Sequence, residues 1–224
     1  MKIVDLSQPL SNDMPIFPQD PDFFLEEKFK NQDHGFSLSL LKTGLHAGTH
    51  IDAPYHFYSS GRKIDNISLE ELIGPVKIVD INTNKTKPNN LEDMLNLEIK
   101  ISDFKNVKKG DRVIVNTGWS KKWGSVDYFS KNPYLSPEVA EFLVKKKILG
   151  LGIDGPSVDP LGKTDIHKKI LFNDIWIIEN LTRLEEIIKY KESHSLEFFF
   201  IPLPIVAEAS PVRVFARIKK ISKE

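Results

Sequence analysis

The chain of 224 residues contains no cysteine, and this absence removes several kinds of chemistry at once. Disulfide scaffolds, zinc ribbons, iron–sulfur clusters and thiol nucleophiles all require cysteine. Any metal site in this protein must therefore be built from imidazole and carboxylate groups.

Arginine is scarce, and charge of neither sign is in excess. The chain has 5 Arg against 26 Lys, and its 31 basic residues are balanced by 31 acidic residues. A neutral protein has no long-range field that would collect a polyanion, and recognition of phosphates and bases favours arginine. We therefore expect a small-molecule substrate, with neither nucleic acid nor membrane as a partner.

Long hydrophobic runs are also missing. The longest apolar stretch, residues 198–207, is interrupted by Pro202 and Pro204, whereas a helix that spans a bilayer needs about 20 apolar residues. The N-terminus reaches Asp5 after only two apolar residues, too few for a secretory signal, whose apolar core has about 7–15. These features predict a cytoplasmic protein.

The order of predicted elements favours one α/β domain that comprises residues 1–224. No internal repeat or low-complexity linker divides the sequence. Short β-branched or aromatic segments predict eight strands, at residues 3–6, 37–43, 76–81, 112–117, 148–153, 175–179, 196–201 and 212–218. Helices and strands do not alternate strictly, which indicates mixed β-sheets with flanking helices rather than a doubly wound parallel sheet.

Two helices carry recognisable start signals. In residues 136–147, Ser136 can cap the helix and Pro137 suits its first position. Residues 68–71 form a capping-box pattern that starts at Ser68 and runs toward Gly74. Residues 90–97, 164–171 and 182–189 are weaker helical patterns.

Three of the six histidines lie within eleven residues, together with one aspartate: His46, His50, Asp52 and His56. All four positions are even, so a fully extended strand would place their side chains on one face. Residues four apart in a strand are about 13 Å apart, whereas two imidazoles on one zinc need nitrogens within about 3–3.5 Å of each other. The backbone must therefore bend, and Gly48 is the residue that permits the bend.

The residue types in this stretch suit a divalent metal. Two histidines and one carboxylate, His46, His50 and Asp52, fit Zn, Mn or Fe(II) and leave coordination positions open for water or substrate. From the residues alone, His56 is either a fourth ligand or a free imidazole that moves a proton near neutral pH.

Residues 46–56 resemble the H-x-G-T-H-x-D-x-P-x-H signature of the metal-dependent cyclase family, which includes bacterial kynurenine formamidase and isatin hydrolase. The resemblance extends to Asp5-Leu6-Ser7 with residues 15–18, to the central turn at residues 152–160, and to residues 210–213. It implies a swivelling β/β/α fold and homodimers or homotetramers.

The resemblance also implies a site and a reaction. His46, His50 and Asp52 would hold a first metal, and Asp52 would bridge to a second metal held by His167 and Glu179, which are twelve positions apart. Two Zn ions, or Mn, would be the cofactor. The implied reaction is hydrolysis of an amide-like C–N bond, as in the conversion of N-formyl-L-kynurenine to kynurenine and formate.

The family further implies that His56 is the proton donor and acceptor and that residue 17 faces the substrate. Phe17 stands where formamidases commonly carry Trp, so an aromatic wall is kept but an indole N–H is lost. Gly155 replaces a common Thr in the central turn. Both departures bear on which amide is cleaved, and neither affects an expected ligand.

Two other functions stay open at this stage. One is a mononuclear Mn-dependent hydrolase of cyclic amides or lactones, of the isatin-hydrolase type, and the other is a metal-binding module without catalysis. The residues leave open the roles of Asp154, Ser157, Asp159, Trp119 and Trp123.

Overall fold

The computed structural model describes residues 1–81, 92–191 and 193–220. Its main element is a mixed sheet of nine strands. In spatial order eight of these are β5 (Ile73–Gly74), β12 (His194–Pro202), β13 (Ala209–Lys220), β4 (His50–Asp52), β11 (Trp176–Glu179), β10 (Gly150–Ile153), β8 (Arg112–Asn116) and β6 (Val76–Asp80), and β1 (Lys2–Asp5) pairs with β13. Strands β6, β8, β10 and β11 are parallel, and the remaining pairs of the sheet are antiparallel.

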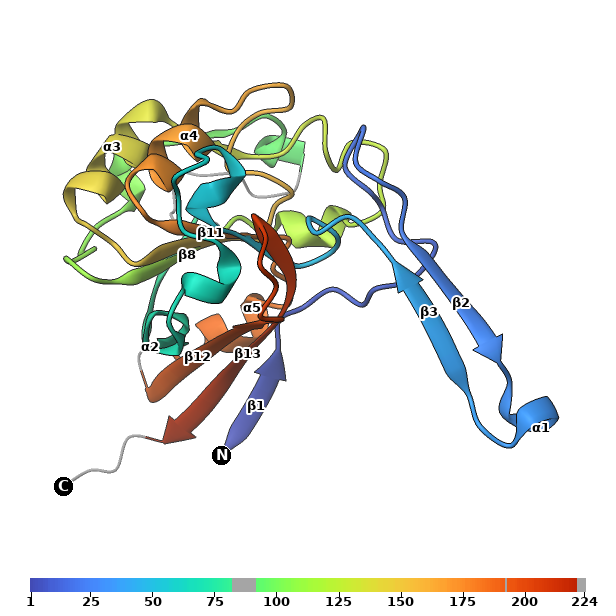
Figure 1. The fold of residues 1–224 in the computed structure, drawn as a ribbon. Coiled ribbons are helices and arrows are strands. Elements are labelled where there is room, and N and C mark those ends of the chain that lie inside the picture. The colour runs from blue at the N-terminus through green and yellow to red at the C-terminus, as the bar shows by residue number, and fades with distance from the viewer. Residues whose placement is uncertain (82–91, 192, 221–224) are drawn as a thin grey trace.

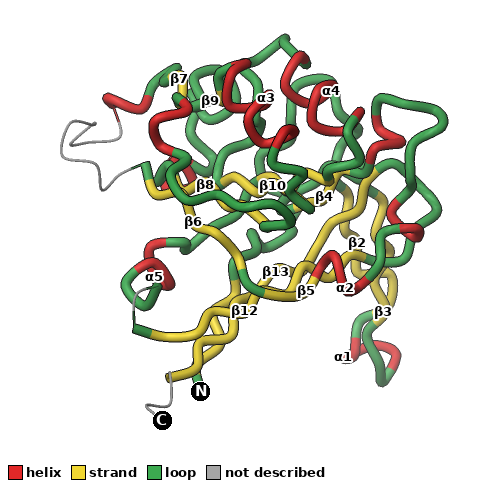
Figure 2. Tube along the Cα trace, turned by 90° about the vertical axis from the view of Figure 1, so that its left-hand side faces the viewer, coloured by secondary structure: helices red, strands yellow, loops and turns green. Residues whose placement is uncertain are grey.

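Helices α3 (Pro137–Lys145) and α4 (Asp165–Phe172) cover one face of the parallel half, while β12 and β13 lie on the other side (Figures 1 and 2). Residues of β8 alternate accordingly: Val113 and Val115 pack toward the helices, and Ile114 packs toward the cluster that contains Phe198 and Phe200. A strand buried on both faces is continuously apolar, which explains the apolar run of Val113, Ile114 and Val115.

The smaller elements lie around this sheet. They are the helices α1 (Asn31–His34), α2 (Leu69–Leu72) and α5 (Glu185–Ile188), the strand pair β7 (Glu98–Ile99) and β9 (Tyr134–Leu135), and the hairpin strands β2 (Phe24–Phe29) and β3 (Leu38–Lys42). The hairpin projects from the body as an arm (Figure 1). In the described part of the chain, no helix is long and apolar enough to cross a membrane.

Each of the eight expected strand segments coincides with a strand, and the mixed character of the sheet is confirmed. Ser136 caps α3, since its Oγ accepts a hydrogen bond from the backbone N–H of Val139 at 3.4 Å. The expected capping at residues 68–74 is wrong. The Ser68 side chain makes no capping bond, and Gly74 lies in β5, because the chain passes directly from α2 into a strand that pairs with β12.

Of the weaker helical patterns, one is a helix of the expected length and the other two contain only short turns. Residues 164–171 correspond to α4, and residues 182–189 contain only the single turn of α5. Within residues 90–97, the described part holds a 3₁₀ turn at Glu92–Met94, and residues 90–91 lie outside the described residues.

Candidate metal centre

The chain bends sharply just before strand β4. Gly48 has a φ of +62°, which L side chains rarely adopt, and a Cβ built on it would lie 2.4 Å from Cδ2 of Leu10. The bend places His46 in a turn and His50 at the start of the strand, with 5.1 Å between their ring centroids. The expected bend at Gly48 is therefore confirmed.

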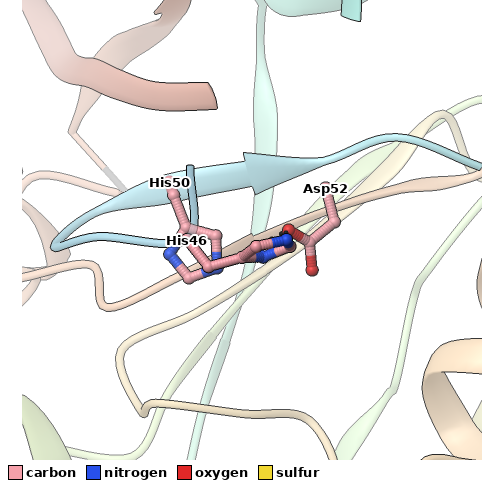
Figure 3. Close-up of side chains that lie close together, drawn as sticks. All are labelled: His46, His50 and Asp52. Carbon is pink, nitrogen blue, oxygen red and sulfur yellow. Dashed lines mark ion pairs between the residues drawn. The ribbon is translucent and has the colours of Figure 1, made fainter. Parts of the chain in front are cut away.

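The first group consists of His46, His50 and Asp52, whose ligand atoms all lie within 4.8 Å of one another. Asp52 Oδ1 is 2.9 Å from His46 Nδ1 and 3.5 Å from His50 Nε2. Figure 3 shows the two imidazole rings and the carboxylate gathered beside β4. His50 and Asp52 share a face because they are two residues apart in the strand.

The second group consists of Asp52, His167 and Glu179, and it meets the same 4.8 Å criterion. Strand β11 runs antiparallel to β4 with Glu179 directly opposite His50, so the two side chains lie on the same face of the sheet. Helix α4 lies over that face and supplies His167, whose Nε2 is 3.0 Å from Glu179 Oε1 and 3.7 Å from Asp52 Oδ2. One oxygen of Asp52 thus faces each group.

The donor atoms fit a divalent metal. Asp52 is 1% exposed, and within the described residues its Oδ1 has no hydrogen-bond partner although His46 Nδ1 is close. A buried carboxylate oxygen without a hydrogen bond is costly unless a cation satisfies it. The set of imidazole and carboxylate donors without thiolate suits Zn or Mn.

In the metal-free protein, the histidines and carboxylates of the two groups shift one another's pKa values. Burial alone would lower the pKa of His46, but the adjacent Asp52 carboxylate raises it to about 9. Burial would also lower the pKa of His167, but Glu179 and Asp159 raise this pKa to about 10. Although burial opposes its ionisation, the imidazoles of His46 and His50 hold the pKa of Asp52 well below its usual range.

His56 lies beside the first group but outside both. It ends a 3₁₀ turn at Pro54–His56, and its ring centroid is 4.4 Å from that of His46. Burial and the neighbouring histidines lower the pKa of His56, in spite of the Asp52 charge. Its imidazole is therefore mostly uncharged at neutral pH and able to accept a proton.

A pocket of about 160 Å³ opens onto both groups. Its walls include the expected substrate residue Phe17, which contacts Phe129 edge to face at a centroid distance of 5.5 Å, and also Phe57. Two charged residues, Asp20 and Lys163, line it as well. The pocket therefore combines aromatic walls with charges of both signs.

The chain is similar to known proteins over most of its length. The Cyclase family matches residues 4–160. Kynurenine formamidase of Bacillus cereus is 32% identical over 219 residues, with 96% of each chain covered. The chain belongs to the cyclase family. The resemblance expected from residues 46–56 is thereby confirmed.

Two further proteins are similar to this cyclase-family chain, one in sequence and one in fold. Kynurenine formamidase of Bacillus cytotoxicus is 30% identical over 224 residues, with 96% of each chain covered. Among solved structures, isatin hydrolase A of Labrenzia aggregata superposes with a TM-score of 0.82 at 23% identity, covering 98% of this chain and 94% of that chain. This similarity confirms the cyclase-like fold.

Asp159 and Asn180 of this cyclase-family chain lie beside the site and hydrogen-bond to residues of it or next to it. The sequence had predicted no role there for either residue. Asp159 Oδ2 accepts a hydrogen bond from His167 Nδ1 at 2.7 Å. The side-chain Nδ2 of Asn180 donates to Gly48 O, and the backbone carbonyl of Asn180 accepts from Thr49 Oγ1, both at 2.8 Å. Asn180 directly follows Glu179, and its φ of +60° is a conformation in which Asn is favoured over most residues.

The sequence also left open the roles of Asp154, Ser157, Trp119 and Trp123, and the structure shows what each of them contacts. Asp154 accepts hydrogen bonds from the N–H and Oγ1 of Thr117 and from the N–H of Gly118, and burial raises its pKa to about 6. Trp119 is fully buried and donates to Tyr128 O. The ring of Trp123 packs against that of Tyr128, with 5.2 Å between the ring centroids. Ser157 lines the pocket, but Trp119 and Trp123 do not.

Proposed function

We propose that this chain is a metal-dependent hydrolase of the arylformamidase type, which cleaves the C–N bond of N-formyl-L-kynurenine to release kynurenine and formate. The observation that carries the proposal is the Asp52 carboxylate, which faces one metal-ligating group with each oxygen at the base of an aromatic-lined pocket. Relatives named kynurenine formamidase, similar over nearly the full chain, support it.

In this proposal His46, His50 and Asp52 hold one divalent cation, and Asp52, His167 and Glu179 hold a second. Zinc is the expected metal, with manganese as the alternative. When bound, such cations lower the pKa of a water molecule and polarise a carbonyl oxygen.

The chain's own residues supply proton transfer and binding. His56 is uncharged at neutral pH because its pKa is lowered, so it can take a proton in the first half of the reaction and return it to the departing amine nitrogen. Phe17, Phe57 and Phe129 provide apolar walls for an aryl ring. Lys163 and Asp20 also line the pocket and can pair with the α-carboxylate and α-ammonium groups at the amino-acid end of the substrate.

The arylformamidase proposal is tested by turnover of the protein loaded with Zn or with Mn. The substrates are N-formyl-L-kynurenine, unsubstituted formanilide and isatin. We expect N-formyl-L-kynurenine to have the highest kcat/KM. A higher kcat/KM on isatin would replace the proposal by the cyclic-amide hydrolase, and failure to turn over any of the three would support the binding module without catalysis.

Metal counting tests the dinuclear site separately. The wild-type chain should hold two ions by elemental analysis, and Glu179→Gln should reduce that number and the activity together. Asp20→Asn, which changes a pocket carboxylate outside both groups, serves as the control and should keep both ions. One ion per wild-type chain, with activity indifferent to Glu179→Gln, would contradict the two-metal arrangement.

A further inference from the structure

The carbonyl oxygen of Gly48 accepts two hydrogen bonds beside the first ligating group. One comes from Nδ2 of Asn180 at 2.8 Å, and the other comes from the ring Nδ1 of His50 at 3.0 Å. A carbonyl oxygen cannot donate, so Nδ1 of His50 must carry a proton. The other ring nitrogen, Nε2, is therefore the one left for a cation, and it lies 3.5 Å from Asp52 Oδ1 and 3.6 Å from Glu179 Oε2.

The orientation of the Asn180 side-chain amide follows from the same contact. Nδ2 must face Gly48 because a donor is needed there, so Oδ1 faces the hydroxyl of Tyr128 at 2.8 Å. An amide oxygen only accepts, and the Tyr128 hydroxyl is therefore the donor. Burial raises the pKa of Tyr128 well above its usual value, so the hydroxyl keeps this proton at neutral pH. The hydrogen bonds thus run in one direction, from Tyr128 through Asn180 to Gly48.

Both members of the Tyr128–Asn180 pair are shielded from water. Tyr128 is fully buried, and Asn180 is 4% exposed. A buried hydroxyl or amide that loses its partner is costly, because no bulk water replaces the lost hydrogen bond. The orientation of the Asn180 amide is therefore set by its two protein partners and not by solvent.

The backbone of Asn180 is anchored as well, so that its side chain starts from a defined place. Its N–H donates to Gly155 O, and its C=O accepts from Thr49 Oγ1, both at 2.8 Å. Thr49 directly precedes β4, and Asn180 directly follows Glu179 at the end of β11. Asn180 thus joins the two segments that carry metal-ligating side chains, once through its backbone and once through its side chain.

Tyr128 is held in turn by aromatic neighbours. Trp119 Nε1 donates to Tyr128 O at 2.9 Å. The rings of Trp123 and Phe129 contact the Tyr128 ring, each with 5.2 Å between centroids. Phe129 lines the pocket and contacts Phe17 there. Tyr128 therefore lies between the aromatic wall of the pocket and the hydrogen bonds that reach the first ligating group.

We propose that Tyr128 and Asn180 are positioning residues for the first metal site. They fix the Gly48 carbonyl, and this carbonyl holds the His50 ring with Nε2 toward Asp52. Neither residue belongs to a ligating group. The inference rests on the proposed function only through the first metal site, and it holds for any substrate.

The expected effect on metal binding is moderate. Loss of a group that directly orients a ligating histidine usually weakens metal binding about 10–100-fold. Asn180 acts one hydrogen bond further from the ring, through the Gly48 carbonyl. Its loss should therefore weaken binding by about tenfold, the lower end of that range. Since Asn180 also lines the pocket, metal affinity without substrate is the quantity that separates positioning from substrate contact.

Zinc titration by calorimetry tests the role of Asn180. Asn180→Gly removes the side chain but tolerates the positive φ of +60°. Asn106→Gly is the matched control, because Asn106 has a φ of +66° and lies exposed on the surface. We expect Asn180→Gly to weaken the affinity for one ion about tenfold and Asn106→Gly to leave it unchanged. Wild-type affinity in Asn180→Gly would overturn the inference alone, whereas a wild type that binds no zinc would overturn the proposed metal centre with it.

A double-mutant cycle tests whether Tyr128 acts through Asn180. Tyr128→Phe keeps the ring and removes only the hydroxyl, and it should weaken zinc affinity about two- to tenfold, as for one neutral hydrogen bond. In the Asn180→Gly background the same change should have no further effect, because the partner is already gone. Tyr134→Phe, on β9 and away from the pocket, should leave the affinity unchanged in both backgrounds. Additive losses, or wild-type affinity in Tyr128→Phe, would overturn the proposed role of Tyr128.

Discussion

His167 is held by Asp159, whose Oδ2 lies 2.7 Å from His167 Nδ1. The same carboxylate accepts hydrogen bonds from the backbone N–H groups of Ile166 and His167, at 2.9 Å each, and thereby also anchors the start of α4. With Nδ1 engaged in this way, Nε2 is the nitrogen that faces Glu179 and Asp52. Asp159 is thus a positioning residue for the proposed second metal.

Asp159→Asn should weaken metal binding and activity about 10–100-fold, the usual effect of losing a carboxylate that orients a ligating histidine. Metal titration by calorimetry gives a readout independent of turnover. Asp165→Asn, in the first turn of the same helix, is the control. Equal metal affinities of wild type and Asp159→Asn would show that the hydrogen bond serves only the helix.

Gly48→Ala should destabilise the protein and reduce metal affinity, since a Cβ would meet Leu10 in addition to an unfavourable φ. Gly110→Ala is the matched control, because Gly110 also has a positive φ but open space around its Cβ position. The control should lose about 1–2 kcal/mol of unfolding free energy for the backbone conformation alone. Denaturant unfolding measures both variants, and adding Leu10→Ala should recover part of the excess loss at Gly48.

His56→Gln should lower kcat about 10²–10⁴-fold while the metal content is unchanged, because His56 is outside both ligating groups and contributes proton transfer. His194→Gln is the control, because His194 lies on β12 and does not line the pocket, and it should leave kcat and metal content unchanged. A variant that loses metal along with activity would instead identify His56 as a ligand.

Lys163→Ala should raise KM for N-formyl-L-kynurenine about two- to fivefold and leave formanilide turnover unchanged, since the exposed lysine at the pocket would pair only with the amino-acid carboxylate. Lys109→Ala is the control, because Lys109 does not line the pocket. Steady-state kinetics on the two substrates distinguish this recognition from a general effect on the site.

In the metal-free protein, stability should fall as the pH rises from about 6.5 to about 10. The folded pKa values of His46 and His167, about 9 and about 10, are above the ordinary 6.5 of histidine. Their contribution is complete below pH 6.5 and is lost as the pH rises through the folded values. Added metal should reverse the trend, because it binds neutral imidazole.

This pH dependence is measured as the difference in melting temperature between chelator-treated wild type and His167→Gln across the same range. The difference should shrink with rising pH. If it stayed constant or grew, the coupling of His167 to Glu179 and Asp159 would not exist in the folded state.

Local sequence rules were enough to predict several parts of the molecule. Eight strands followed from β-branched and aromatic segments, and the spacing of His46, His50 and Asp52 around Gly48 required a bend that the structure contains. The family signature in residues 46–56 then indicated His167 and Glu179 as further candidates. Strand formation and backbone bending depend on residues that are close in sequence, so both can be predicted from the sequence alone.

The meeting of residues that are distant in sequence depends on the tertiary fold. The register that sets Glu179 opposite His50, and the packing of α4 that brings Asp159 and His167 over the same face, join segments more than one hundred residues apart. The arm was half recognised, since β3 was expected but its pairing with β2 was not. Its apolar residues would ordinarily predict burial in the core, and only the fold shows that this hairpin remains outside, because burial depends on what packs against a strand and not on the strand's own composition.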